Sequence, residues 1–249
     1  MAEKRLDVLL TPGELATGDI AGRTVVVLDV LRATTSIVEA MASGARTLFP
    51  VATIEEAIGL AKTLGREEVL LAGERKALPI EGFDLGNSPG DFTAERVGGK
   101  FVVMSTTNGT LALMAAASGE RVIVGAWTNF QAVVDDLVRT GADPVFLCAG
   151  RDRVFGLEDA VCAGQMAAAL MKALPETEWE LNDGAVAALA LAEEFPDPAA
   201  LFPHTTAGRA IVDAGLGEDL EWCARTDLRD VLPVLEGRQI VLAAVEAES

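Results

Sequence analysis

The fold class is indicated first by residues 25–51, VVVLDVLRATTSIVEAMASGARTLFPV. Residues 25–31 and 46–51 are short apolar runs, which are typical of buried strands. Residues 35–43 between them have the apolar spacing of a helix. Strand, helix and strand in this order predict a βαβ unit, in which the two strands run parallel.

The same alternation continues along most of the chain. Further apolar runs predict strands at 5–10, 68–72, 101–104, 122–125 and 144–147, and helical patterns lie at 54–64, 109–117 and 130–139. Together these elements predict an α/β fold, a three-layer α/β/α arrangement with a largely parallel or mixed sheet.

Helices predominate after residue 156, so we expect a helix-rich C-terminal part. Helical patterns lie at 157–174, 185–194, 206–214 and, more briefly, 220–225, and a last strand at 239–245 is expected to join a sheet edge. No Gly/Ser-rich or Pro-rich linker interrupts the chain. We therefore expect a single domain over residues 1–249, with two closely packed lobes as the alternative.

The composition excludes several classes of protein. Half of the 249 residues (50%) are hydrophobic, enough for a large core, and a net charge of −18 argues against nucleic-acid binding. The chain has no apolar segment of about 18 residues, as a membrane span requires, and no signal-peptide pattern. Its sparse, odd set of cysteines suits a reducing compartment, so we expect a cytoplasmic protein. With one His and no CxxC motif, any metal should be a hard ion bound by carboxylates.

Polar side chains follow several of the predicted strands. Ligands of open α/β sheets bind at the C-terminal ends of strands, so these side chains form the candidate site. They are Asp29, Arg32, Thr34 and Thr35; Glu74 and Arg75; Thr106, Thr107, Asn108 and Gly109; and Arg151, Glu158 and Asp159. Residues 82–90 form a further polar loop, in which Asp84 and Asn87 either line a site or cap the loop as Asx turns. Asn87 and Ser88 are added to the candidate site.

The segment 29–35 allows two interpretations. Asp29 and Arg32 interrupt an apolar strand, and neither is readily buried without a partner. They either pair with each other while Thr34 caps the next helix, or Asp29 faces a metal and Arg32 an oxyanion. In the second case N–H groups near Thr34 and Thr35 add further donors.

The other candidates also have structural alternatives. Residues 105–110 suit a phosphate at a helix N-terminus, or form an ordinary cap. Glu74 and Arg75 serve the site or form a surface ion pair. Glu158 and Asp159 bind a metal or only complement a helix dipole.

Three familiar hydrolytic mechanisms do not fit. Haloacid-dehalogenase-type phosphatases need Asp-x-Asp, but Leu31 stands two places after Asp29. Cysteine phosphatases need Cys-x5-Arg, but Val154 stands six places after Cys148. The Gly-x-Ser-x-Gly elbow of serine hydrolases is absent. We expect His204 to be structural or a substrate contact, not the catalytic base.

Five motifs in order resemble the 2-phosphosulfolactate phosphatase family. They are DVLRATT at 29–35, GER at 73–75, GFDLGNSP at 82–89, TTNGT at 106–110 and EDAVCAG at 158–164, and the resemblance covers nearly the whole chain. It implies a magnesium-dependent hydrolysis of 2-phosphosulfolactate to sulfolactate and phosphate, which in methanogens belongs to coenzyme M biosynthesis. It also implies an α/β fold peculiar to the family and a homodimer.

Roles within this reaction are assigned from chemistry. The candidate catalytic residues are Asp29, Arg32 and Glu74. The Mg²⁺ ligands are expected among Asp29, Glu74, Asp159 and Glu158, with Asp84 in reserve. The candidate substrate-binding residues are Thr34, Thr35, Arg75, Asn87, Ser88, Thr106, Thr107, Asn108 and Gly109, with Arg151 a weaker candidate.

Alternatives to this mechanism and function remain open. The expected nucleophile is a metal-activated water, because no side-chain nucleophile has an evident partner base. A phosphorylated Asp29 is the alternative, and a phosphorylated Cys148 is a weaker one. The chain could instead be a non-catalytic binder of small anionic metabolites, or a structural subunit whose polar strand ends form a dimer interface.

Overall fold

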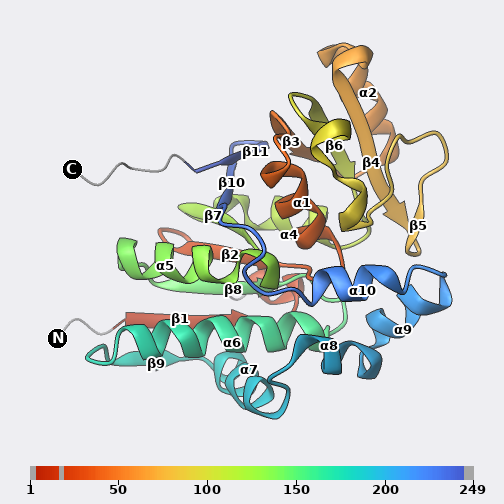
Figure 1. The fold of residues 1–249 in the computed structure, drawn as a ribbon. Coiled ribbons are helices and arrows are strands. Elements are labelled where there is room, and N and C mark those ends of the chain that lie inside the picture. The colour runs from red at the N-terminus through yellow and green to blue at the C-terminus, as the bar shows by residue number, and fades with distance from the viewer. Residues whose placement is uncertain (1–3, 17–19, 244–249) are drawn as a thin grey trace.

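The computed structural model describes residues 4–16 and 20–243, which form a mixed sheet flanked by helices (Figure 1). From edge to edge the strands are β5 (Leu78–Pro79), β4 (Val69–Arg75), β6 (Phe101–Ser105), β3 (Thr47–Pro50), β11 (Gln239–Leu242), β10 (Pro233–Glu236), β7 (Arg121–Gly125), β2 (Thr24–Leu28), β8 (Pro144–Cys148), β1 (Lys4–Leu9) and β9 (Trp179–Leu181).

Helices connect most of the strands and pack on the sheet. They are α1 (Ala33–Ala42), α2 (Ile54–Leu64), α3 (Ala94–Val97), α4 (Gly109–Ala115), α5 (Phe130–Thr140), α6 (Leu157–Ala173), α7 (Asp183–Glu194), α8 (Pro198–Leu201), α9 (Thr206–Asp213) and α10 (Glu218–Cys223). The α/β/α fold expected from the sequence is confirmed, and so is the helix-rich C-terminal part. None of the helices in the described part of the chain has the length and apolar character that crossing a membrane requires.

The sheet consists of two parallel halves that run in opposite directions. Strands β7, β2, β8, β1 and β9 are parallel to one another, and so are β3, β6 and β4. The hairpin β10–β11 lies between the halves and pairs antiparallel with both β7 and β3. A single register pair, Ile240 with Leu48, joins β11 to β3.

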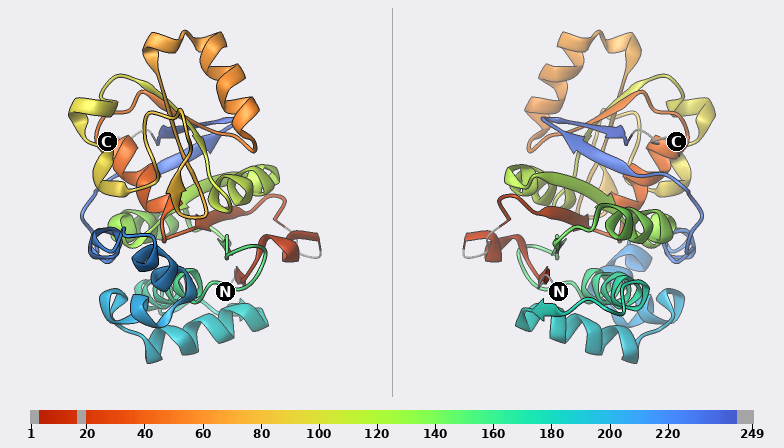
Figure 2. Two further views of the ribbon diagram at one scale, coloured as in Figure 1. Left: turned by 90° about the vertical axis from the view of Figure 1, so that its right-hand side faces the viewer. Right: turned by 90° about the vertical axis from the view of Figure 1, so that its left-hand side faces the viewer.

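The C-terminal ends of the two halves nevertheless meet. In Figure 1, β4 descends toward α10 while β1 runs across the view toward the same side. Figure 2 shows the half that carries α2 above the half that carries α6 and α7. Twist between neighbouring strands accumulates across a wide sheet, and this allows the two halves to be turned against each other. Strand ends from both halves therefore face one region.

The structure corrects three expectations about strands. The predicted edge strand at 239–245 is wrong in position, because β11 lies inside the sheet between β3 and β10; residues 244–245 lie outside the described residues. The strand predicted at 25–31 ends at Leu28. The short strands β5, β9 and β10 were not predicted, since two to four residues carry little periodicity.

Helix α1 is the central connection between the halves and is buried on all sides. Every residue from Ala33 to Met41 is buried, as expected for a helix that packs within a core. Its only charged residue, Glu39, is 1% exposed and accepts hydrogen bonds from Nε and Nη2 of Arg229 at 2.9–3.2 Å. This pairing satisfies a charge that would otherwise be expensive to bury.

Candidate active site

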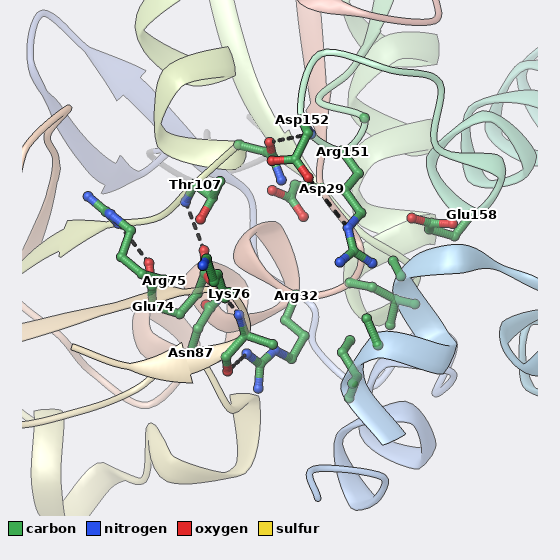
Figure 3. Close-up of a pocket in the computed structure, with 17 residues that line it drawn as sticks. Asp29, Arg32, Glu74, Arg75, Lys76, Asn87, Thr107, Arg151, Asp152 and Glu158 are labelled. Atoms are coloured by element: carbon green, nitrogen blue, oxygen red, sulfur yellow. Dashed lines mark hydrogen bonds and ion pairs between the residues drawn. The ribbon is translucent and has the colours of Figure 1, made fainter. Parts of the chain in front are cut away.

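The C-terminal ends of β2, β4, β6 and β8 converge on a cavity of about 590 Å³ (Figure 3). A cavity of this size suits a small-molecule ligand. It is lined by Asp29, Leu31, Arg32, Glu74, Arg75, Lys76, Ala77, Asn87, Thr107, Asn108, Gly150, Arg151, Asp152, Glu158, Ala207, Ala210 and Ile211.

The turn between β2 and α1 places Asp29 on the cavity wall. The N–H of Asp29 donates to Oγ1 of Thr34 (3.1 Å), and Oγ1 of Thr35 donates to the carbonyl of Val30 (2.9 Å). Both threonines are fully buried and do not line the cavity. Thr34 and Thr35 therefore fix the shape of the turn, and the structure does not bring them to the cavity as predicted ligand contacts.

Helix α4 approaches Asp29 through Gly109. A Cβ atom at position 109 would lie 2.7 Å from Oδ2 of Asp29 and 2.5 Å from Cβ of Ala33, both shorter than side chains tolerate. Glycine is thus required for this close approach. The neighbouring Asn108 lines the cavity, and its Oδ1 accepts the N–H of Asp152 (3.1 Å).

Asp29 and Glu158 present carboxylates to the cavity, and both are buried. Burial, followed by the negative charges of Glu74 and Glu158, raises the pKa of Asp29 from 3.8 to about 7. Burial also raises the pKa of Glu158, opposed by a hydrogen bond with Thr205 and the charge of Arg151. Like charges are therefore concentrated at this point of the cavity, as is common in functional sites.

Asp159 lies behind these two carboxylates. Its Oδ1 accepts the N–H of Val30 (2.9 Å) and its Oδ2 the N–H of Gly150 (3.0 Å), so it ties the end of β2 to the end of β8. Burial and then the charges of Asp29 and Glu158 raise the pKa of Asp159 well above its ordinary value. Asp159 does not line the cavity, so its visible role is to hold two loops together.

Glu74 lines the cavity from the end of β4. Its Oε1 accepts the N–H of Thr107 (2.8 Å) and its Oε2 the N–H of Ala77 (2.9 Å). The carboxylate thus orders the β6–α4 loop and the β4–β5 turn. The surface ion pair considered for Glu74 and Arg75 is not present, because Glu74 is buried and Arg75 donates to other oxygens.

Arg32 reaches the cavity wall but is only 2% exposed. Its Nη1 donates to Oδ2 of Asp219 (2.6 Å) and to Oγ of Ser88 (3.3 Å), and its Nη2 to the carbonyl of Ala77 (2.6 Å). The pairing of Arg32 with Asp29, one of the two interpretations of this segment, is absent, and the partner is Asp219 instead. The peptide bond that precedes Arg32 is cis.

The cavity has further guanidinium groups. Arg75 donates from Nη1 to the carbonyls of Glu74 and Ser105, and from Nη2 to Oγ of Ser105 (2.8 Å). Arg151 donates from Nη1 to the carbonyl of Thr206 (2.9 Å), which ties the loop after β8 to α9. Both lie on the cavity wall.

The remaining predicted residues divide between the cavity and its supports. Asn87 lines the cavity and is 4% exposed. Oγ of Ser88 donates to Asp219 (2.8 Å), so Ser88 belongs to the support of Arg32. Thr106 exchanges hydrogen bonds with Thr110, each backbone N–H donating to the other's Oγ1 at 3.1 Å, and it does not line the cavity.

The side chains that line the cavity fit a divalent metal bound by few protein ligands and several waters. Among residues 4–16 and 20–243, no group of three His, Cys, Asp or Glu side chains could hold an ion. Small hard ions also bind through one or two carboxylates, with waters and substrate oxygens completing the shell. Asp29 and Glu158 can supply carboxylates, and Oδ1 of Asn87 and Oγ1 of Thr107 are buried without a hydrogen-bond partner. Such unpartnered oxygens fit metal-bound waters.

Sequence reasoning missed part of the wall and one of its supports. Asp219 supports Arg32 from 187 residues away, and no local pattern marks such a pair. Lys76 lines the cavity from the β4–β5 turn beside the GER motif, and its Lys-Ala sequence has no hairpin signal that would have identified it. Ala207 and Ile211 form an apolar part of the wall on α9.

Two residues considered for a chemical role, Cys148 and His204, do not line the cavity. Cys148 is fully buried, and burial followed by the charge of Asp159 raises the pKa of its thiol well above the ordinary value. The reactive thiolate is therefore disfavoured. His204 is exposed and does not line the cavity.

Comparison with known proteins shows which family the chain belongs to. The family model described as 2-phosphosulpholactate phosphatase matches residues 9–238. The chain belongs to the 2-phosphosulfolactate phosphatase family. The five motifs quoted above all lie within the matched range.

Relatives in the 2-phosphosulfolactate phosphatase family match along nearly their whole lengths. A protein of Carboxydothermus hydrogenoformans named "Probable 2-phosphosulfolactate phosphatase" is 38% identical over 240 residues, 95% of this chain and 97% of its own. A protein of the same name from Symbiobacterium thermophilum is 40% identical, covering 90% of this chain and 96% of its own. Another from Clostridium beijerinckii is 32% identical, covering 92% of this chain and 95% of its own.

Proposed function

We propose that this protein is a phosphatase that hydrolyses 2-phosphosulfolactate, or a related phosphorylated 2-hydroxy acid, to the hydroxy acid and phosphate. The observation that carries the proposal is a cavity with buried carboxylates and cationic side chains at four strand ends, in a chain of this family. A substrate with phosphate, carboxylate and sulfonate groups needs cations close at hand. The net charge of −18 would repel it, so the attraction has to be local.

The reaction consumes one water. The water oxygen forms a bond to phosphorus, the bond from phosphorus to the 2-oxygen of the substrate breaks, and that oxygen takes up a proton. The guanidinium group of Arg151, whose charge acts on Glu158, attracts the phosphate, and Arg32 adds positive charge on the side of the β4–β5 hairpin. Gly109 keeps α4 against Asp29 and so holds its carboxylate in position.

We further propose that the site works with Mg²⁺ held by Asp29 and Glu158. The ion would polarise the phosphoryl group and orient the attacking water. Glu74 and Asp159, the other two candidate ligands, each already accept two backbone N–H bonds and act first as supports of the surrounding loops. The unpartnered oxygens of Asn87 and Thr107 are available to bound water.

Three further expectations belong to the same proposal. The protein is a homodimer, it works in the cytoplasm, and in organisms that make coenzyme M its reaction belongs to that synthesis. The resemblance to the family implies the homodimer and the coenzyme M step. The free, buried state of Cys148, Cys162 and Cys223 is in keeping with a reducing compartment.

The test is phosphate release from a panel of phosphorylated 2-hydroxy acids, with Mg²⁺ and with EDTA. We expect release from 2-phosphosulfolactate that depends on the metal. A protein that releases no phosphate from any member, yet is stabilised against heat by them, is a binder, and the proposal is then wrong.

The chemical route has its own test. Direct attack by water leaves no covalent intermediate, so acid quench within the first turnover should leave the protein unlabelled by substrate phosphorus. A phosphorylated Asp29 recovered in that experiment would replace the direct route with a two-step one.

A further inference from the structure

Lys76 stands at the tip of the β4–β5 hairpin, on the rim of the cavity. Arg75 pairs with Leu78 across the hairpin, so Lys76 and Ala77 form a two-residue turn. Their φ angles are 53° and 68°. Two-residue turns of this kind usually carry Asn-Gly or Asp-Gly, because other side chains are disfavoured at positive φ. The chain holds a lysine where local preference favours a different residue.

The turn is held by two residues of the cavity wall. The N–H of Ala77 donates to Oε2 of Glu74 (2.9 Å), and the carbonyl of Ala77 accepts from Nη2 of Arg32 (2.6 Å). Glu74 and Arg32 are both buried. The backbone at Lys76 is therefore ordered by the site itself, before any ligand arrives.

Lys76 also differs from the other cations of the wall. Arg32, Arg75 and Arg151 each donate hydrogen bonds to oxygens of the protein. In the part of the chain that the structure describes, the ammonium of Lys76 has no hydrogen-bond or ion-pair partner. Its side chain is exposed at the cavity rim, so its three donors are available to a ligand.

The position of Lys76 indicates which part of the substrate it meets. Asp29 and Glu158, the proposed metal ligands, come from the β2–β8 half and α6, whereas Lys76 comes from the β4–β5 hairpin of the other half. In the view of Figure 3, Lys76 and Glu158 lie on opposite sides of Asp29. A phosphate bound beside Asp29 and Glu158 would thus allow the rest of the substrate to extend toward the hairpin.

We propose that Lys76 is a specificity-determining residue whose ammonium binds the sulfonate of the substrate, one of the two anionic groups that are not transferred. The inference rests on the proposed function. An ammonium on a flexible stem is a compact charge with three donors, which suits the three equivalent oxygens of a sulfonate. Arg151, which follows β8, is the proposed partner of the phosphate.

The test compares two substrates that differ only in the sulfonate, 2-phosphosulfolactate and 2-phospholactate. For Lys76→Met we expect kcat/KM on 2-phosphosulfolactate to fall on the order of tenfold to a hundredfold, the range for a lost bond between charged groups. The loss should lie mainly in KM, and it should be much smaller on 2-phospholactate. Lys76→Arg should recover most of the loss. Lys62→Met, an exposed lysine on α2, is the matched control and should behave as the wild type.

Two outcomes overturn the inference. An equal loss on both substrates would mean that Lys76 acts on the phosphate, on the carboxylate or on the fold. An unchanged kcat/KM on 2-phosphosulfolactate would mean that Lys76 does not contact the substrate. Lys76→Gly, which relieves the positive φ, should show the same selective loss if Lys76→Met folds poorly.

A binding measurement separates this inference from the proposed function. Sulfolactate should raise the melting temperature of the wild type, and Lys76→Met should need on the order of tenfold more sulfolactate for the same rise. If the wild type hydrolyses neither substrate, the proposed function fails. A sulfolactate effect that is equal in wild type and Lys76→Met then overturns the role of Lys76 separately.

Discussion

The charged residues at the cavity differ between the two halves of the sheet in how their charges are stabilised. On the β2–β8 half, burial followed by the charges of Glu74 and Glu158 raises the pKa of Asp29 to about 7. On the β4–β5 half, Glu74 accepts two backbone N–H bonds, and Arg75 donates to the carbonyls of Glu74 and Ser105 and to the hydroxyl of Ser105. At the cavity wall, Asp29 holds a charge that its surroundings disfavour, whereas Glu74 and Arg75 hold charges that hydrogen bonds compensate.

This difference indicates separate roles for the two halves, one in binding a cation and the other in positioning loops. Uncompensated buried carboxylates attract a cation and favour chemistry at that point. Groups whose charges are already hydrogen-bonded, such as Glu74 and Arg75, hold loops in place and so determine the shape of the cavity wall. Lys76 is the exception on the β4–β5 half, which is why its substitution is expected to change selectivity. The following predictions test the contrast, beginning with the largest expected effect.

Removing the central charge of the β2–β8 half should abolish turnover. Asp29→Asn is expected to lower kcat/KM by ~10³-fold or more, since a metal ligand contributes several kcal/mol to stabilising the transition state. Steady-state phosphate release measures it, with the exposed Asp213→Asn on α9 as control. Turnover retained within tenfold would remove Asp29 from the site.

Breaking the buried ion pair that supports the β4–β5 half should weaken the fold. Asp219→Ala leaves Arg32, whose side chain is 2% exposed, without its partner and is expected to cost about 3–5 kcal/mol in urea unfolding. Arg238→Ala is the matched control, because the Arg238–Glu56 pair leaves the Arg238 side chain 75% exposed and should contribute less than about 1 kcal/mol. Equal losses in the two variants would show that burial does not distinguish the pairs.

Without metal, the ionisation of Asp29 should make the stability of the folded protein depend on pH. The pKa of Asp29 is raised from 3.8 to about 7, so the folded state holds this proton more tightly than the unfolded state. Its contribution to stability therefore declines as pH rises from about 4 to 7, and the full penalty applies above 7. In EDTA, Asp29→Asn should melt several degrees above the wild type at pH 8, with a smaller gap at pH 5. A difference in melting temperature that is larger at pH 5 than at pH 8 would contradict the raised pKa of Asp29.

The smallest expected effect concerns the strained turn. Ala77 has a φ of 68°, which costs an L-residue about 1 kcal/mol, while glycine adopts it freely. Because glycine also gains freedom in the unfolded chain, Ala77→Gly should stabilise the protein by only about 0.5 kcal/mol. Thermal unfolding measures it. Destabilisation would mean that the turn has another source of support.

Much of the fold could be predicted because the local signals were strong. The helix at 54–64 matches α2 at both ends, and that at 157–174 exceeds α6 by one residue. The reversal of direction at β10–β11 could not be predicted, because it depends on which strands pair across the whole chain. Within the site, Asp29, Glu74 and Glu158 were found by their place after strands. The roles of Thr34 and Asp159 depend on backbone groups that only the folded chain brings near them.

The order of strands has a consequence for synthesis on the ribosome. Strands β3, β4 and β6 follow one another in the chain, so their half can assemble early, whereas β1 and β2 must wait for β7 and β8. The hairpin β10–β11, which inserts between the halves, follows all the other described strands in the chain. The nascent chain therefore holds an incomplete sheet with open edges until this hairpin emerges, and such edges invite wrong pairing. Emergence of the hairpin, rather than folding of any early segment, completes the sheet between the two halves.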